Sequence, residues 1–422
     1  MHCLNKAYPE PVSCTLPNGL RIVHLPHASE VVYCGYAINV GTRDELPQEA
    51  GMAHFVEHLL FKGTTRRRAW HILNRMECVG GELNASTNKE DTIVHCTCLR
   101  KDFARAADLL TDIVFHSTFP AHEIERERGV ILDEIQSYQD NPSELIFDDF
   151  EEQIFQGHPL GRNILGHAND LERYSTTDFI AFTQRHYQPS NMVFFLMGNI
   201  SMTRIQKLLT KYTDSLPVAT PAAFPPQPTR TICINHSPTH IVNHKQTNQA
   251  HVILGALATD ELHLPESRMP LALLSDLLGG SGMNSRLNVA LRERRGLVYS
   301  VDSSISTYTD ALLFAIYFGT DPGRVDTCKQ LVYRELQKIV REPLSTSALS
   351  SFKRQAIGQL IIAETETNEN AAIALGRSLL HHRPYNTLPR IIQLIEAVTT
   401  HDIQRVASQL LNTNSLSSLC YT

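Results

Sequence analysis

The alternation of hydrophobic and polar residues predicts strands and helices in both halves of the chain. Short apolar runs typical of strands occupy residues 31–40, 92–99, 192–197, 251–257 and 311–318. Helical spacing of apolar residues covers residues 51–63, 103–115, 123–138, 268–280, 324–340, 346–363 and 387–398. Because the strands cluster and do not alternate strictly with helices, the pattern favours an α+β fold over a doubly wound α/β fold.

A proline-rich segment divides the chain into two nearly equal halves. Residues 217–230 contain five prolines in fourteen residues, which is typical of an extended linker. We therefore predict an N-terminal domain over residues 1–216 and a C-terminal domain over residues 231–422. Each is expected to hold a largely antiparallel sheet with helices packed on it.

The two halves repeat one strand followed by one helix. The run 31–40 precedes the helical segment 51–63, just as the run 251–257 precedes the segment 268–280. Aligning Met52 with Met269 pairs residues as follows: His54 with Leu271, Glu57 with Leu274, and His58 with Ser275. The polar side chains exist only in the first copy, which favours a function for them over a role in packing.

Residues 54–58 read His-Phe-Val-Glu-His. Two histidines four residues apart lie on one face of a helix, so both can reach a single metal ion. This spacing is typical of a zinc hydrolase, in which His54 and His58 bind Zn²⁺ and Glu57 is the base that activates a zinc-bound water. The alternative is an amphipathic helix whose two histidines bind no metal.

A third ligand is expected from the helical segment 123–138. Glu127 and Glu134 are seven residues apart, so they share a helix face with the apolar Ile131. A carboxylate that points towards packed structure needs a cation as a partner. We predict Glu134 as the third metal ligand and Glu127 as a supporting carboxylate that orients a ligand or a water. The alternative is that both form surface ion pairs with Arg126 or Arg128.

Composition narrows the class of protein. Hydrophobic residues make up 42% of the chain and charged residues 19%, with a net charge of −6, which describes a globular protein with no expected nucleic-acid partner. No apolar stretch reaches the roughly 18 residues of a membrane span, and the first residues lack the apolar region of a signal peptide. Nine cysteines without a C-x-x-C pair fit a reducing, cytoplasmic compartment.

Five segments together resemble the pitrilysin/insulinase family of inverted zinc peptidases, and most closely its mitochondrial-processing-peptidase-like branch. They are GMAHFVEHLLFKGT at 51–64, GGELNASTNKEDT at 80–92, ERGVILDEI at 127–135, HPLGRNILG at 158–166, and SRL with LRERRGLVYS between 285 and 300. The resemblance extends over essentially the whole chain. It implies His54, His58 and Glu134 as zinc ligands, Glu57 as the catalytic base and Glu127 as a further carboxylate of the site.

The resemblance also implies substrate contacts. Asn84 and Ala85 match an edge strand that hydrogen-bonds the backbone of an extended peptide, and Arg292 and Tyr299 match a pair that reaches the substrate near the scissile bond. Without the resemblance, Asn84 would be interpreted as a turn residue and Arg292 as a solvated charge.

The predicted function is a zinc endopeptidase that hydrolyses short or unfolded peptides. Relatives of this length enclose their site by pairing two chains, so we expect a homodimer, or a heterodimer with an inactive homologous chain. The alternative is a non-catalytic scaffold or partner subunit. The predicted ligands and base are all present, which favours the enzyme.

Overall fold

A computed structural model describes residues 9–216, 237–245, 247–258, 262, 265–364 and 368–422. The predicted linker at 217–230 lies outside these residues. The described chain forms two compact units. Among the described residues, unit 1 draws on 9–136, 162–216, 364 and 368–387, and unit 2 draws on 137–161, on those between 237 and 363, and on 388–422.

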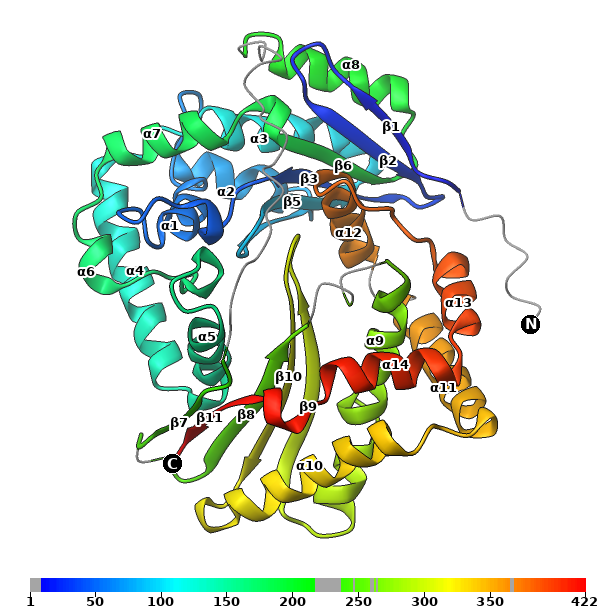
Figure 1. Cartoon of the computed structure of the whole chain (residues 1–422). Helices are drawn as coiled ribbons and strands as arrows, with labels where there is room; N and C mark the ends of the chain where they lie inside the picture. Colours follow the sequence, from blue (N-terminus) through cyan, green and yellow to red (C-terminus); the bar gives the residue numbers. More distant parts are fainter. Residues whose placement is uncertain (1–8, 217–236, 246, 259–261, 263–264, 365–367) are drawn as a thin grey trace. The chain divides into compact units, whose positions relative to one another are not determined.

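Unit 1 is built on a six-stranded sheet (Figure 1). The strands in spatial order are β1 (Val12–Thr15), β2 (Arg21–Pro26), β6 (Met192–Gly198), β3 (Val31–Ile38), β5 (Thr92–Leu99) and β4 (Glu82–Thr87). Every neighbouring pair is antiparallel except β2 and β6. The strand β4 therefore lies at one edge of the sheet, paired only with β5 among the described residues.

One face of this sheet carries the larger apolar core of unit 1. Large aromatic side chains such as Tyr36, Phe55 and Phe194 are fully buried there. The helices of unit 1 that precede β6 are α1 (Met52–Leu59), α2 (Ala69–Glu77), α3 (Phe103–Phe115), α4 (Ala121–Gln139), α6 (Ala168–Leu171) and α7 (Thr176–His186), and α8 (Met202–Thr213) follows it. The last residues of α4 belong to unit 2.

The opposite face of the unit 1 sheet is covered by α12 (Asn368–Leu380), which comes from the C-terminal half of the chain. Leu375 packs there in a cluster with Phe195 of β6. Arg377 forms an ion pair of 2.9 Å with Asp91, and Glu369 lies 3.2 Å from His95. Apolar packing and charge pairing together fix this helix to the sheet.

Unit 2 repeats the same architecture on a five-stranded sheet. Its strands in spatial order are β7 (His240–Asn243), β11 (Ser417–Tyr421), β8 (Ala250–Leu257), β10 (Leu312–Thr320) and β9 (Val298–Thr307). Only β7 and β11 are parallel. Its own helices are α9 (Pro265–Gly279), α10 (Val325–Arg341), α11 (Thr346–Glu364), α13 (Leu388–Ala397) and α14 (Thr400–Leu410). The second face is covered by α5 (Pro142–Ile154), whose Phe150 packs in a cluster with Ile253 of β8.

The two sheets correspond strand by strand. The order β2-β6-β3-β5-β4 in unit 1 matches β7-β11-β8-β10-β9 in unit 2, with the one parallel pair at the same place. The α+β prediction, with two related halves that each carry a largely antiparallel sheet and packed helices, is confirmed. The compact units depart from the two halves of the sequence in one respect, because α5 and α12 are exchanged between them.

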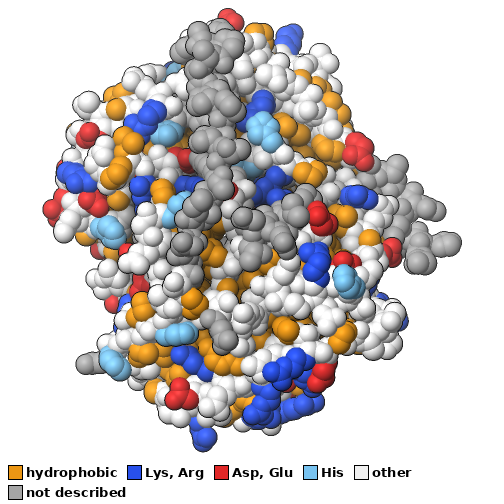
Figure 2. All heavy atoms as spheres, viewed as in Figure 1, with side chains coloured by type: hydrophobic (Ala, Val, Ile, Leu, Met, Phe, Trp, Pro, Cys, Tyr) orange, Lys and Arg blue, Asp and Glu red, His pale blue; other side chains and the backbone are white. Residues whose placement is uncertain are grey.

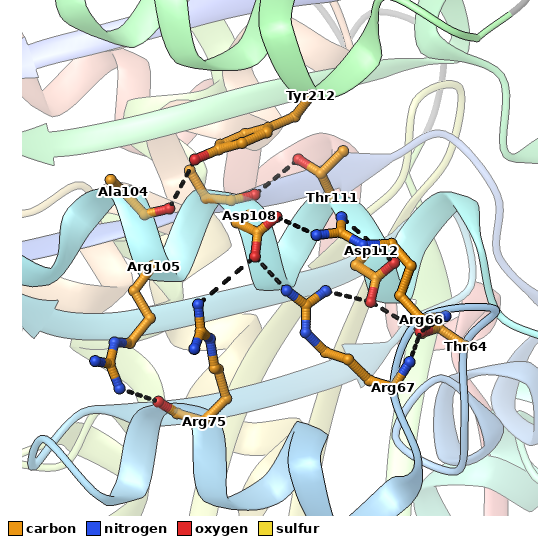
Figure 3. A network of polar contacts seen from close by, with 11 residues as sticks. Thr64, Arg66, Arg67, Arg75, Ala104, Arg105, Asp108, Thr111, Asp112 and Tyr212 are labelled. Atoms are coloured by element: carbon orange, nitrogen blue, oxygen red, sulfur yellow. Dashed lines mark hydrogen bonds and ion pairs between the residues drawn. The ribbon is translucent and has the colours of Figure 1, made fainter.

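The segment after α1 is fixed by ion pairs to α3 (Figure 3). The guanidinium of Arg67 contacts both Asp108 and Asp112, and Arg66 lies 3.1 Å from Asp108. The hydroxyl of Thr64 donates a 2.8 Å hydrogen bond to Asp112, whose side chain is buried. These contacts hold the C-terminal end of α1 against the core.

Acidic, basic and hydrophobic side chains are interspersed on the face shown in Figure 2. Within the described part of the chain, no helix combines the length and the apolar character needed to cross a membrane.

Candidate metal centre

The helix α1 carries both histidines of the H-x-x-E-H motif, and its N-terminus is capped by Glu45. The buried Glu45 carboxylate accepts hydrogen bonds from the backbone N–H groups of Gly51, at 3.1 Å, and Ala53, at 2.9 Å. A carboxylate at this end satisfies free N–H groups and complements the helix dipole. Phe55 and Leu59 are fully buried on the core side. The polar residues of the motif consequently lie on the other side of the helix.

His54, His58 and Glu134 come together although α1 and α4 are distant in sequence. One nitrogen or oxygen atom from each lies within 4.8 Å of the others. Glu134 Oε2 is 3.8 Å from His54 Nε2 and 3.7 Å from His58 Nε2. These distances exceed a hydrogen bond and suit ligands that share one ion at about 2 Å from each. Among the described residues, no other group of three His, Cys, Asp or Glu side chains meets this criterion.

The electrostatics of His54 favour metal binding. Burial, followed by the neighbouring His58, lowers the pKa of the His54 imidazole to about 3. The ring is therefore neutral near pH 7, which is the form that binds metals. Within the described residues, His54 Nδ1 has no hydrogen-bond partner. Two imidazoles and a carboxylate are also the donor set that zinc accepts, so the residues present fit the ion.

Glu127 supports His58 from the side away from Glu134. Its Oε2 atom lies 3.2 Å from His58 Nδ1, and its Oε1 atom lies 2.6 Å from Lys62 Nζ. The contact at Nδ1 orients the ring and leaves Nε2 towards Glu134. Glu127 and Glu134 therefore both face α1, and neither forms the surface pair that was the alternative.

The two arginines of that alternative have other partners. Arg126 pairs with Glu123 at 3.7 Å, and Arg128 pairs with Glu125 at 2.6 Å.

Glu57 is held by Thr87, which was not among the predicted site residues. The Thr87 hydroxyl, at the end of β4, donates a 2.6 Å hydrogen bond to Glu57 Oε2. Burial raises the pKa of the Glu57 carboxyl above its ordinary value, and the Thr87 hydroxyl and His58 oppose this shift. The sequence signal for Thr87 was its place on the predicted edge strand, three residues after Asn84.

Asn84 and Ala85 lie within β4 and not in a turn. The strand packs against α1 and has a free edge, since only β5 pairs with it in the described chain. Asn84 is exposed, and its side-chain oxygen accepts the Ala85 N–H at 2.9 Å. An extended chain could add to this edge by backbone hydrogen bonds.

Arg292 and Tyr299 belong to unit 2, whereas the other predicted site residues belong to unit 1. Arg292 lies in a π-helical segment, Asn288–Glu293, and its side chain is exposed. Tyr299, on β9, is 80% exposed. Both side chains are therefore exposed on unit 2.

Known proteins resemble the chain along most of its length. The sequence profile described as Insulinase (Peptidase family M16) matches residues 22–168, and the profile described as Peptidase M16 inactive domain matches residues 173–356. An uncharacterized zinc protease of Mycobacterium leprae is 34% identical over 400 residues, which is 94% of this chain and 88% of the relative. The chain belongs to peptidase family M16. A second relative, the uncharacterized zinc protease YmxG of Bacillus subtilis, is 32% identical over 398 residues, or 94% of each chain.

Solved structures share the fold of this M16 chain. A protease from Helicobacter pylori superposes with a TM-score of 0.87 at 22% identity, covering 98% of this chain and all of the other. A Pseudomonas fluorescens structure, titled as a peptidase M16 inactive domain, gives 0.85 at 19% identity and covers 98% and 97% of the two chains. The first half, which carries the H-x-x-E-H motif, matches the insulinase profile, and most of the second half matches the inactive-domain profile.

Proposed function

We propose that this M16 chain is a zinc-dependent endopeptidase that hydrolyses short or unfolded peptides. The observation that carries the proposal is the cluster of His54, His58 and Glu134, with Glu57 on the same helix as the two histidines. Zinc protease relatives support the choice of metal.

The three ligands would hold the ion, and Glu57 would move the proton. When bound, zinc supplies a Lewis acid that acidifies a water and polarises a peptide carbonyl. Glu57 accepts a proton from the attacking water and delivers it to the leaving amine. Both steps need a carboxylate that gains the proton and then releases it. Thr87 keeps the carboxylate in one orientation.

Substrate would bind along β4 as an added strand. Backbone hydrogen bonds to an edge strand give affinity with little dependence on sequence, which suits unfolded peptides. Ala85 would contribute its backbone to this pairing, and the exposed Asn84 side chain would contact the peptide. Arg292 and Tyr299 would donate hydrogen bonds to the developing oxyanion or to the substrate backbone, and their exposure supports this role.

We further propose that the chain belongs to the mitochondrial-processing-peptidase-like branch and works as a dimer, with a second copy or with an inactive homologue. The length of the chain and its two-unit architecture support this assembly. The seven described cysteines are free thiols, which supports the predicted reducing, cytoplasmic compartment. Measurement of the mass of the purified protein in solution tests the assembly.

A non-catalytic role is the competing proposal. A missing metal ligand or base would support it. In this chain the first helical segment, 51–63, carries the two histidines and the base, and the second segment, 268–280, lacks them. The deciding experiment is cleavage of a quenched fluorescent peptide by the zinc-loaded protein, by the chelator-treated protein and after zinc is restored. Cleavage that is lost and regained supports the peptidase, and an absence of cleavage in every sample contradicts it.

A further inference from the structure

Lys62, Glu127 and His58 form a chain of three contacting side chains. The Glu127 carboxylate bridges the other two, at 2.6 Å from Lys62 Nζ and 3.2 Å from His58 Nδ1. Glu127 is 6% exposed, and Lys62 is only partly exposed. We infer that Lys62 is a positioning residue that acts on the zinc ligand His58 through Glu127, an inference that rests on the proposed function.

Glu127 depends on Lys62 for compensation of its negative charge. A buried carboxylate is costly unless a cation or several hydrogen bonds compensate its charge. Among the described residues, the cationic side chain that pairs with Glu127 is Lys62, whose ammonium contacts the Oε1 atom. The other oxygen is thereby directed to His58 Nδ1. Without the Lys62 ammonium, we expect the Glu127 carboxylate to turn towards solvent.

The backbone of Lys62 is itself held in place by hydrogen bonds. Its N–H group donates a 3.1 Å hydrogen bond to the carbonyl of Leu59, at the end of α1. Thr64, two residues later, is attached to Asp112 on α3 (Figure 3). The ammonium therefore projects from a rigid turn, and its pairing with Glu127 ties α4 to α1. Since Glu134 lies two turns further along α4, this tie also sets the position of the third ligand.

The two histidines differ in the hydrogen bonding of their Nδ1 atoms. His58 has a carboxylate at Nδ1, whereas His54 Nδ1 has no hydrogen-bond partner among the described residues. Carboxylates that support a ligand in this way typically change metal affinity by about 10–100-fold when they are lost. Loss of Lys62 should reproduce much of that effect although Lys62 does not touch the ion.

The test measures zinc affinity by competition with a chromophoric chelator, using the full chain and zinc alone as the probe. We expect Lys62→Met to weaken zinc binding by about tenfold or more, and Lys62→Arg to restore most of the affinity. Arg126→Met is the matched control, because it removes an exposed cation one residue from Glu127 that pairs with Glu123 instead. It should bind zinc like the wild type.

A second variant separates positioning from general destabilisation. In a Glu127→Gln background, Lys62→Met should weaken zinc binding by less than about twofold, because the route through the carboxylate is already lost. Wild-type affinity in folded Lys62→Met would overturn the inference and leave the proposed function standing. Equal losses with and without Glu127 would also overturn it. A wild-type protein that binds no zinc would overturn both proposals.

Discussion

The helix that precedes the edge strand differs between the two units in chemistry and not in position. In unit 1, α1 follows β3 and packs against β4, and in unit 2, α9 follows β8 and packs against β9. The residues of α1 that gather at the metal centre are replaced on α9 by buried Leu271, Leu274 and Ser275. The fold thus repeats this helix in both units, and the metal-binding histidines and the base are present on α1 but not on α9.

In each unit the helix contacts the edge strand through a pair of side chains, at positions that differ between the units. Glu57 of α1 accepts the Thr87 hydroxyl of β4, and Ser275 of α9 lies 3.1 Å from the Ser303 hydroxyl of β9. A cavity of about 360 Å³ opens beside Ser275 and Ser303 in unit 2. The packing of a helix on the edge strand therefore belongs to the shared architecture, whereas the imidazoles and carboxylates belong to the chemistry of unit 1.

The largest effect is expected when a metal ligand of unit 1 is removed, whereas the matched change in unit 2 should have no effect on zinc binding. His58→Ala should lose most of its zinc, because two ligands that remain bind far less tightly than three. Its peptidase activity should fall below detection. Ser275→Ala, at the equivalent position of unit 2, should keep a full equivalent of zinc. Metal analysis of both purified proteins checks this, and a full equivalent in His58→Ala would show that the ligand is wrongly assigned.

The next largest effect is expected from a variant that removes the base and still binds zinc. Glu57→Gln should retain zinc and lower kcat by about a hundredfold or more, since the amide keeps the shape but cannot accept a proton. Glu125→Gln, which changes an exposed carboxylate of α4, should have normal turnover. Steady-state kinetics and metal content measured together make the comparison. Turnover near that of the wild type in Glu57→Gln would rule out Glu57 as the base.

A smaller effect is expected at Thr87. A hydrogen bond to a charged group contributes roughly 1.5–3 kcal/mol, so Thr87→Val should lower kcat by about tenfold or more while KM and zinc content stay unchanged. Thr87→Ser should recover most of the rate. Ser303→Ala, which removes the hydroxyl that contacts α9 in unit 2, should leave kcat unaltered. An unchanged kcat in Thr87→Val would mean that the 2.6 Å contact does not position the base.

The smallest effect concerns the exposed tyrosine of unit 2. Tyr299→Phe removes one hydroxyl from an 80% exposed side chain, so folding and zinc content should be unaffected. If this hydroxyl assists the oxyanion, kcat/KM should fall by about tenfold at most, in line with one weak donor. An unchanged kcat/KM would exclude the hydroxyl from the reaction.

Periodicity predicted the elements that are long and regular. β5 and α3 begin and end at the predicted residues, and α4 and α10 differ by one or two residues at each end. Spacing within a single helix also placed His54 and His58 on one face, and the seven-residue spacing placed Glu127 beside Glu134.

Pairs that form through space could not be predicted in this way. Thr87 reaches Glu57 across 30 residues, and Lys62 reaches Glu127 across 65, so no local pattern records either contact. The exchange of α5 and α12 was missed for the same reason, because amphipathic periodicity shows that a face is buried but not which sheet covers it.

The position of the zinc ion tests the account most directly. X-ray diffraction from crystals of the zinc-loaded protein, collected on both sides of the zinc absorption edge, locates the ion without relying on activity. We expect one anomalous peak per chain, at about 2.0–2.2 Å from His54 Nε2, His58 Nε2 and a Glu134 oxygen. The equivalent place beside Leu271 and Ser275 should show no peak. A zinc peak elsewhere with none at this cluster would contradict the account.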